Sequence, residues 1–251
     1  MQQRTLAFIG AGNMSRSIIA GLIQAGYPAE RITAANPSRP KLDELADQFG
    51  IRITQNNAEA AREAEVIVLA VKPQLMAAML EALVAELGSL AGKLLISIAA
   101  GIKVERLQEM AGGHSRIIRT MPNTPSLLGL GMTGLYAPSG IEQADRDFAE
   151  QMMQAVGKTL WVAQESGING VIAASGSAPA YFFLFMQGIA EEAEAMGFSP
   201  EQARLLVQQT ALGAAAMVEQ NPELSLQALR EQVTSKGGTT AISAAMASTA
   251  G

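Results

Sequence analysis

The sequence predicts an α/β protein in which a doubly wound, mostly parallel sheet is followed by an all-helical region. Short apolar runs rich in branched residues alternate with helix-like stretches along the first part of the chain, as a sheet covered on both faces requires. After Val162 the strand signals stop, and long helices rich in alanine, methionine and leucine take over. We therefore expect a sheet domain at 1–162 and an all-helical domain at 163–251.

The strands are expected to be buried, because they are continuous apolar runs without alternation that end in Gly, Lys-Pro or Ala-Ala-Gly. The predicted strands lie at 5–9, 31–36, 66–71, 94–98, 116–120 and 158–162. The predicted helices lie at 13–25, 38–49, 74–87, 167–197, 200–219 and 225–233. Ser199 suits the N-cap and Pro200 the first position of the helix at 200–219.

The composition bounds the class of protein. The chain has 251 residues, of which 49% are hydrophobic and 16% charged, enough for the core of one large or two modest domains. A net charge of −5 without a dense Lys/Arg run argues against DNA or RNA as partners. The absence of cysteine excludes disulfides, thiolate nucleophiles and Cys-ligated metals, and we expect no metal site. Without the features of a signal peptide, we expect a cytoplasmic protein.

No charged residue falls between Glu165 and Glu191, so this segment resembles a membrane span in length and composition. Polar residues such as Asn169 and Gln187, and the "GSAP" break at 176–179, favour two helices packed in protein instead. Two explanations stay open for these apolar faces: an extensive homodimer interface, or the core of a single chain. We expect no membrane partner.

A glycine turn, "GAGNMS", follows the first predicted strand and opens a helix. Gly10 permits a tight turn, and Gly12 lets the backbone approach a pyrophosphate. The helix that begins near Asn13 points its N–H groups at that anion. Ser15 stands where Gly or Ala is usual and still permits close helix packing. In this strand, turn and helix context the motif predicts a Rossmann-type dinucleotide site.

The end of the second strand favours NADP over NAD. An NAD-selective site places Asp or Glu there to accept from the ribose 2′-hydroxyl, whereas this chain has Asn36, Ser38 and Arg39. A guanidinium and hydroxyl groups suit a 2′-phosphate. The alternative is that Asn-Pro-Ser-Arg is only a helix N-cap turn with a solvated arginine.

Further motifs follow the glycine turn along almost the whole chain. They are "FIGAGNM" (8–14), "AVKPQ" (70–74), "SIAAG" (97–101), "IRTMPNTP" (118–125), "GSAPAY" (176–181) and "SKGGTT" (235–240). In order and spacing they resemble the pyrroline-5-carboxylate reductase family. The resemblance implies that NADPH delivers hydride to the C=N carbon of 1-pyrroline-5-carboxylate, which gives L-proline. It also implies a homodimer, or a larger assembly, formed through the C-terminal helices.

The resemblance implies a set of cofactor-binding positions at or beyond the carboxyl ends of predicted strands, where ligands of open α/β sheets bind. Without the resemblance, "KP" reads as a strand-ending turn and "AAG" as a tight loop. Asn57 is expected near the adenine end. The full set is Ile9, Gly10, Ala11, Gly12, Asn13, Met14, Asn36, Ser38, Arg39, Asn57, Ala70, Val71, Lys72, Pro73, Ala99 and Ala100.

The loop "SKGGTT" is implied to hold the imino acid. The carboxylate of the imino acid would be held by Ser235, Gly237, Gly238 and Thr239. Thr240, the catalytic candidate, would hydrogen-bond the ring nitrogen of the imino acid. Successive N–H groups of a glycine turn suit a small anion. The loop departs from the family at Lys236, where proline is common, and we expect a modest change in substrate affinity. The chain stops eleven residues after Thr240, which we expect to affect dimer stability or loop order.

Other enzyme classes fit less well. The single histidine, His114, is expected to be a solvated turn residue, and no G-x-S-x-G motif supports a hydrolase. A β-hydroxyacid dehydrogenase would share the layout but needs a lysine early in its helical domain, and none occurs between Lys158 and Lys236. A non-catalytic dinucleotide-binding dimer would keep the glycine turn but would not need the second loop.

Overall fold

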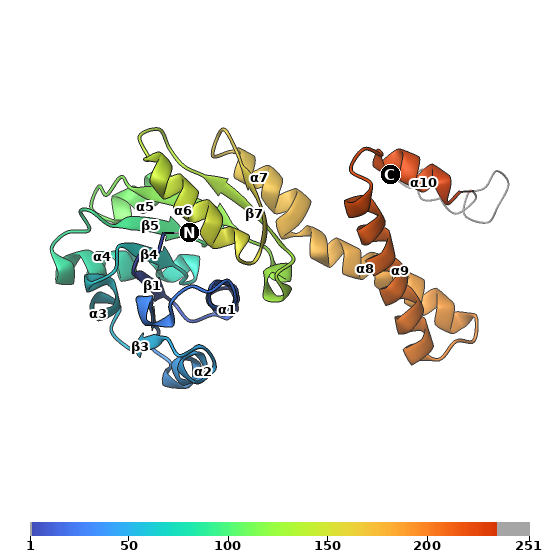
Figure 1. Cartoon of the computed structure of the whole chain (residues 1–251), viewed down its shortest axis with the longest axis horizontal. Coiled ribbons are helices and arrows are strands. Elements are labelled where there is room, and N and C mark those ends of the chain that lie inside the picture. Colours follow the sequence, from blue (N-terminus) through green and yellow to red (C-terminus); the bar gives the residue numbers. More distant parts are fainter. Residues whose placement is uncertain (1, 235–251) are drawn as a thin grey trace. The chain divides into compact units, whose positions relative to one another are not determined.

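Residues 2–234 are described in a computed structural model, and the chain divides between Pro179 and Ala180 into two compact units (Figure 1). The first unit contains the whole sheet. It also contains the segment after Val162, because Val171 packs against the backbone of Gly134 and the side chain of Ile168 is fully buried. The second unit is helical in its described part. The predicted fold class is confirmed.

The sheet has eight strands in the order β3-β2-β1-β4-β5-β6-β7-β8. Neighbouring strands are parallel except for β6 and β7, which are antiparallel. The strands are β1 (Leu6–Ile9), β2 (Ile32–Ala35), β3 (Arg52–Thr54), β4 (Val66–Leu69), β5 (Leu94–Ser97), β6 (Ile117–Met121), β7 (Gly131–Tyr136) and β8 (Gly157–Trp161). Because β1 to β6 all run in one direction, they end along the same side of the sheet, which we call the carboxyl edge.

Helices cover both faces of this sheet (Figure 1). One buried apolar cluster joins α1 (Asn13–Gln24), α2 (Arg39–Phe49) and α6 (Gln143–Gln154) to the sheet, and a second joins α3 (Asn57–Arg62), α4 (Met76–Leu87) and α5 (Val104–Met110) to its other face. Along β1, Leu6 and Phe8 belong to the first cluster, and Ala7 and Ile9 to the second. A strand buried on both faces has no polar side, which explains the continuous apolar runs in the sequence. Short 3-10 turns lie at Ala29–Arg31, Pro73–Leu75 and Thr124–Leu128.

The remaining helices are α7 (Gly167–Val171), α8 (Ala178–Ala195), α9 (Pro200–Gln220) and α10 (Leu226–Gln232). The prediction for the start of α9 is confirmed. Ser199 is its N-cap, with Oγ accepting from the N–H of Gln202 at 3.3 Å, and Oε1 of Gln202 accepts in return from the N–H of Ser199 at 2.9 Å. Pro200 follows at the first helical position. This reciprocal pair satisfies two N–H groups that the helix itself leaves without partners.

The apolar segment after Glu165 consists of α7, a π turn at Ile172–Gly176 and α8, which follow one another in the helical run Gly167–Ala195. A bend at Ser177 separates the π turn from α8 and lies at the break predicted for "GSAP". By length and composition alone, that run is long and apolar enough to cross a membrane. Only 11% of its most apolar 18-residue stretch is buried inside the described structure. No residue of α8 is buried in the described chain, and the side chains from Tyr181 to Phe185 are 62–69% exposed. Among residues 2–234, α7 therefore contributes buried side chains to the first unit, whereas α8 contributes none.

A buried carboxylate ties three segments together at the side of the sheet opposite the carboxyl edge. Asp145 on α6 is fully buried, and its Oδ1 accepts from Nη1 of Arg4 at 2.7 Å. Nε and Nη2 of Arg116 donate to Oδ2 and Oδ1 of the same carboxylate at 2.5 and 2.8 Å. Burial raises the pKa of Asp145, but the hydrogen bonds and charges of the two guanidinium groups outweigh it and hold that pKa below its ordinary value.

Replacement of this carboxylate tests its contribution to stability. We expect Asp145→Asn to lower the free energy of unfolding at pH 7 by about 3 kcal/mol, near the lower limit for a broken buried pair because both guanidinium groups keep access to water. The folded-state pKa is below the unfolded value of about 4, so this stabilisation is present above about pH 4 and disappears as the pH falls through the folded-state pKa.

Urea unfolding of wild type and variant at pH 7 and at successively lower pH measures the difference. As a control, Asp147→Asn changes an exposed carboxylate of the same helix and should alter stability by no more than about 0.5 kcal/mol. A wild-type advantage that is the same at every pH would contradict the assignment.

Candidate dinucleotide-binding site

The glycine turn connects β1 to α1 at the carboxyl edge. Gly10 has a φ angle of +113°, and a Cβ there would lie 2.6 Å from the carbonyl oxygen of Ala70, so both backbone conformation and space require glycine. Gly12 is the N-cap of α1 with extended backbone, and a Cβ there would meet nothing within 4 Å. The space above Gly12 is open, and the first N–H groups of α1 face a position where an anion can bind.

Ser15 has a larger part in this turn than its small size suggests. Its side chain is buried, and Oγ donates to the carbonyl of Gly10 at 2.6 Å. This hydrogen bond connects the first turn of α1 to the start of the glycine loop at Gly10. The motif alone predicts only a small residue at Ser15, although a hydroxyl at the third motif position is also a signal for such a bond.

Asn36, after β2, joins the two turns at the carboxyl edge. Its Oδ1 accepts from the N–H of Ala11 at 3.2 Å, and its Nδ2 donates to the carbonyl of Ser38 at 3.3 Å. The amide is therefore engaged with the protein's own backbone. It sets the distance between the glycine turn and the start of α2.

Ser38 and Arg39 are both exposed at the start of α2. Ser38 occupies the N-cap position, but its side chain makes no capping hydrogen bond. The Nε of Arg39 donates to Oδ1 of Asp43, one helical turn later, at 2.8 Å. A hydroxyl not used as a cap and an exposed guanidinium thus lie together beyond β2, as a 2′-phosphate site requires.

The other predicted cofactor positions lie along the same edge. The N–H of Ala70 donates to the carbonyl of Ile9 at 2.9 Å, so the turn after β4 adjoins the turn after β1. Asn57 is the first residue of α3, whose cap is provided by the side chain of the preceding asparagine. The predicted positions therefore follow the ends of β1 to β5 along the carboxyl edge. Of these, the exposed ones are Gly12, Asn13, Ser38, Arg39, Lys72, Pro73 and Ala100.

Asn123, just beyond β6, belongs to this edge but was given no role from the sequence. Its Nδ2 donates to the carbonyl of Ser175 in the π turn at 3.1 Å, and its Oδ1 accepts from the N–H of Met132 on β7 at 2.8 Å. The Oγ of Ser175 is buried and has no partner within the described residues. π turns inside helices are frequent at functional sites. The only signal for Asn123 was its place in the motif "IRTMPNTP", which carries no geometry by itself.

His114 lies before β6, at the side of the sheet away from the carboxyl edge. The expectation of a solvated residue is wrong, because the ring is half-buried and its Nε2 lies 2.9 Å from the carbonyl oxygen of Lys93. Burial lowers its pKa, which favours the neutral ring, while hydrogen bonds to backbone groups oppose that shift. Its position removes it from the candidate site.

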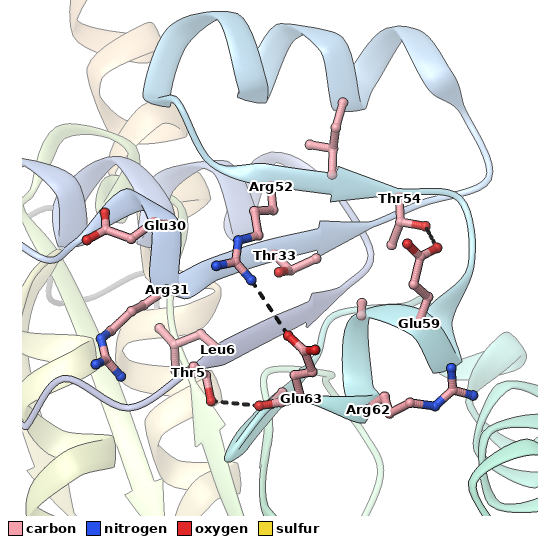
Figure 2. Close-up of a pocket in the computed structure, with 13 residues that line it drawn as sticks. Thr5, Leu6, Glu30, Arg31, Thr33, Arg52, Thr54, Glu59, Arg62 and Glu63 are labelled. Carbon is pink, nitrogen blue, oxygen red and sulfur yellow. Dashed lines mark hydrogen bonds and ion pairs between the residues drawn. The ribbon is translucent and has the colours of Figure 1, made fainter.

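A cavity of about 380 Å³ beside α3 is separate from these positions (Figure 2). Its charged groups are balanced: Nη1 of Arg52 lies 3.7 Å from Oε2 of Glu63, and the hydroxyl of Thr54 donates to Glu59. Because carboxylates lie beside its guanidinium groups, the cavity has no excess of positive charge that would attract a polyanion. It is lined by Thr5, Leu6, Glu30, Arg31, Thr33, Arg52, Ile53, Thr54, Glu59, Ala60, Arg62, Glu63 and Ala64, none of them a predicted cofactor position.

The geometry fits a dinucleotide phosphate better than a metal. Within residues 2–234, no group of three or more His, Asp or Glu side chains could hold a metal ion.

The predicted substrate loop, comprising Ser235, Gly237, Gly238, Thr239 and Thr240, lies outside the described residues.

Comparisons with known proteins agree with this arrangement. Residues 5–101 match the family model of NADP oxidoreductase, coenzyme F420-dependent, and residues 165–250 match that of pyrroline-5-carboxylate reductase dimerisation. Pyrroline-5-carboxylate reductase of Vibrio alginolyticus is 58% identical over 241 residues, which cover 96% of this chain and 88% of that protein. The Haemophilus influenzae enzyme is 48% identical over 246 residues, covering 98% and 90%.

Solved structures give the same result. A pyrroline-5-carboxylate reductase from Coxiella burnetii is similar with a TM-score of 0.92 and 41% identity, over 99% of this chain and 92% of that one. The Plasmodium falciparum pyrroline carboxylate reductase, solved with NADP bound, is similar with a TM-score of 0.85 and 29% identity, over 98% and 90%. The chain belongs to the pyrroline-5-carboxylate reductase family.

Proposed function

We propose that this protein reduces 1-pyrroline-5-carboxylate to L-proline with hydride from NADPH, the last step of proline biosynthesis. The observation that carries this proposal is 58% identity to a pyrroline-5-carboxylate reductase over 96% of the chain. The turns at the carboxyl edge, with an open backbone at Gly12 and an exposed guanidinium at Arg39, suit the NADP form of the cofactor. The absence of lysine between Lys158 and Lys236 argues against the β-hydroxyacid dehydrogenase alternative.

The cofactor is assigned to the carboxyl edge. Gly12 and the first N–H groups of α1 hold the pyrophosphate, and Ser38 and Arg39 hold the 2′-phosphate. The turns after β4 and β5 flank the cofactor through Ala70 to Pro73 and through Ala99 and Ala100. The bound cofactor supplies the hydride. The residues of the chain contribute position and charge, which is how proteins mainly act on nicotinamide chemistry.

The imino acid is assigned to the loop from Ser235 to Thr240. Backbone N–H groups and hydroxyls of Ser235, Gly237, Gly238 and Thr239 hold the carboxylate. Thr240 hydrogen-bonds the ring nitrogen. A protonated C=N group is already electrophilic: hydride adds to the carbon, the π electrons move to nitrogen, and nitrogen keeps its proton. The reaction therefore demands less of a protein acid than carbonyl reduction does.

We further propose that two copies associate through the helices of residues 163–251 and that the dimer is cytoplasmic. The match of residues 165–250 to the dimerisation model supports the association. So do the exposed apolar side chains of α8 from Tyr181 to Phe185. Apolar patches of this kind are typical of protein interfaces.

The first test is oxidation of NADPH, followed by absorbance, with and without 1-pyrroline-5-carboxylate. We expect NADPH oxidation that depends on the imino acid and that is absent with a β-keto or semialdehyde acid. Thr240→Ala should lower kcat/KM about 10- to 100-fold, the effect of one hydrogen bond to a charged group, with NADPH affinity unchanged. Thr240→Ser should recover most of the activity. NADPH binding without reduction of the imino acid would refute the proposed function.

Gly12 provides a test of the pyrophosphate position. Gly12→Val should raise the Kd for NADPH about 100-fold or more, because the side chain fills the space where the anion approaches. Stability should fall by no more than about 1 kcal/mol, the effect of a poorer N-cap, since no protein atom lies within 4 Å of the new Cβ. Gly10→Ala, in contrast, should mainly destabilise the fold. NADPH fluorescence titration and thermal unfolding separate the two effects, and unchanged NADPH affinity in Gly12→Val would exclude this position.

Arg39 tests cofactor selection. Arg39→Asp should weaken NADPH binding about 10- to 100-fold through loss of charge-assisted hydrogen bonds to the 2′-phosphate, and should leave NADH binding nearly unchanged. The matched control is Arg52→Asp, an equally exposed arginine on β3 away from the carboxyl edge, which should preserve the preference. Competition titrations with both cofactors measure the ratio. If Arg39→Asp keeps the wild-type preference, the phosphate is bound elsewhere.

A further inference from the structure

Glu165 lies between β8 and α7, and its carboxylate joins two other elements of the same unit. Its Oε1 accepts a hydrogen bond from the backbone N–H of Val104 at 2.8 Å and another from Nη1 of Arg119 at 3.0 Å. Val104 is the first residue of α5, and Arg119 lies in the middle of β6. One oxygen atom of a third segment thus fixes the start of a helix to a strand.

The bond to Val104 is important because α5 has no local cap. Its N-cap residue, Lys103, is extended and makes no side-chain capping hydrogen bond. The first N–H groups of a helix have no partner inside the helix. Glu165, 61 residues further along the chain, provides an acceptor for the N–H of Val104, one of these unpartnered groups. The start of α5 is therefore held by a tertiary contact.

The segment held in this way is the loop between β5 and α5, residues 98–103, which carries the proposed cofactor positions Ala99 and Ala100. At its start, the N–H of Ile98 donates to the last carbonyl of β4 at 3.2 Å. At its end, the carboxylate of Glu165 holds the first N–H of α5. A loop that positions a ligand needs such support at both ends to keep its contacts within the required fraction of an ångström.

Arg119 fixes the carboxylate in turn. Its side chain is 5% exposed, and a buried guanidinium requires an anionic partner, which Glu165 provides. The Nε of Arg119 is buried without a hydrogen bond among the described residues. Arg119 pairs in register with Ser97, the last residue of β5, so its backbone lies beside the strand that leads into the loop. Loss of the carboxylate would leave an unpaired buried charge there.

We propose that Glu165 is a positioning residue for the cofactor. It touches neither cofactor nor substrate. It holds residues 98–103 against β6 through Val104 and Arg119, so that Ala99 and Ala100 keep their place at the carboxyl edge. The role in catalysis rests on the proposed function, whereas the role in cofactor binding is measured without turnover.

The test compares Glu165→Ala, Glu165→Gln and Glu165→Asp in the full chain. Kd for NADPH is measured by fluorescence titration without substrate, and KM and kcat are measured with 1-pyrroline-5-carboxylate. The matched control is Arg116→Gln, which removes one of the two guanidinium partners of the buried carboxylate of Asp145, away from the carboxyl edge. Thermal unfolding of every variant records the loss of stability.

We expect Glu165→Ala to raise the Kd for NADPH about tenfold and Glu165→Gln, which keeps an acceptor oxygen for Val104 but not the charge, at least about threefold. Arg116→Gln should lose stability but keep the wild-type Kd. If Glu165→Ala does not fold, Glu165→Gln decides. A Kd raised less than threefold in Glu165→Gln, or raised equally in Arg116→Gln, would overturn the proposal. Failure of the wild type to reduce the imino acid would refute the proposed function but leave the Kd comparison valid.

Discussion

The close approach of the chain at Gly10 to the carbonyl of Ala70 is the constraint on which the carboxyl edge depends. β1 and β4 are parallel neighbours, so the chain leaves both strands at the same level and the two turns compete for one space. Glycine resolves this competition, because it has no Cβ and tolerates the φ angle of +113°. With this turn fixed, α1 begins where its N–H groups face open space. Ser15 and Asn36 then hold the turn from two sides.

Charge is used differently at the two sides of the sheet. Away from the carboxyl edge, Asp145 joins Arg4 and Arg116 into a compact network that holds the starts of β1 and β6 against α6. At the carboxyl edge the pair of buried Arg119 and partly buried Glu165 fixes a loop rather than a strand. In the first case two partly exposed guanidinium groups compensate a buried carboxylate, and in the second a partly exposed carboxylate compensates a buried guanidinium. The same chemistry supports the fold on one side and a ligand-bearing loop on the other.

The sequence was informative where the physical signal was local. β1, β4 and β5 could be predicted because strands buried on both faces are uninterrupted apolar runs. β7 could not, because "GMTGLY" contains two glycines that weaken any strand pattern, and their reason is tertiary: a Cβ at Gly134 would collide with Val171 on α7. β3 has only three residues. The positions along the glycine turn were predictable from motif chemistry. The roles of Glu165 and Asn123 depend on contacts between segments far apart in the chain, which no spacing encodes.

The apolar side chains of α8 show what a sequence does not specify. Its sequence shows that the side chains from Tyr181 to Phe185 are apolar but not which chain covers them, and in one copy they remain exposed. If two copies cover this face for each other, folding and association become a single equilibrium. Dilution then shifts this equilibrium toward unfolded, dissociated chains. The apparent midpoint of thermal unfolding rises with protein concentration, and its value describes this protein only when the concentration is stated with it.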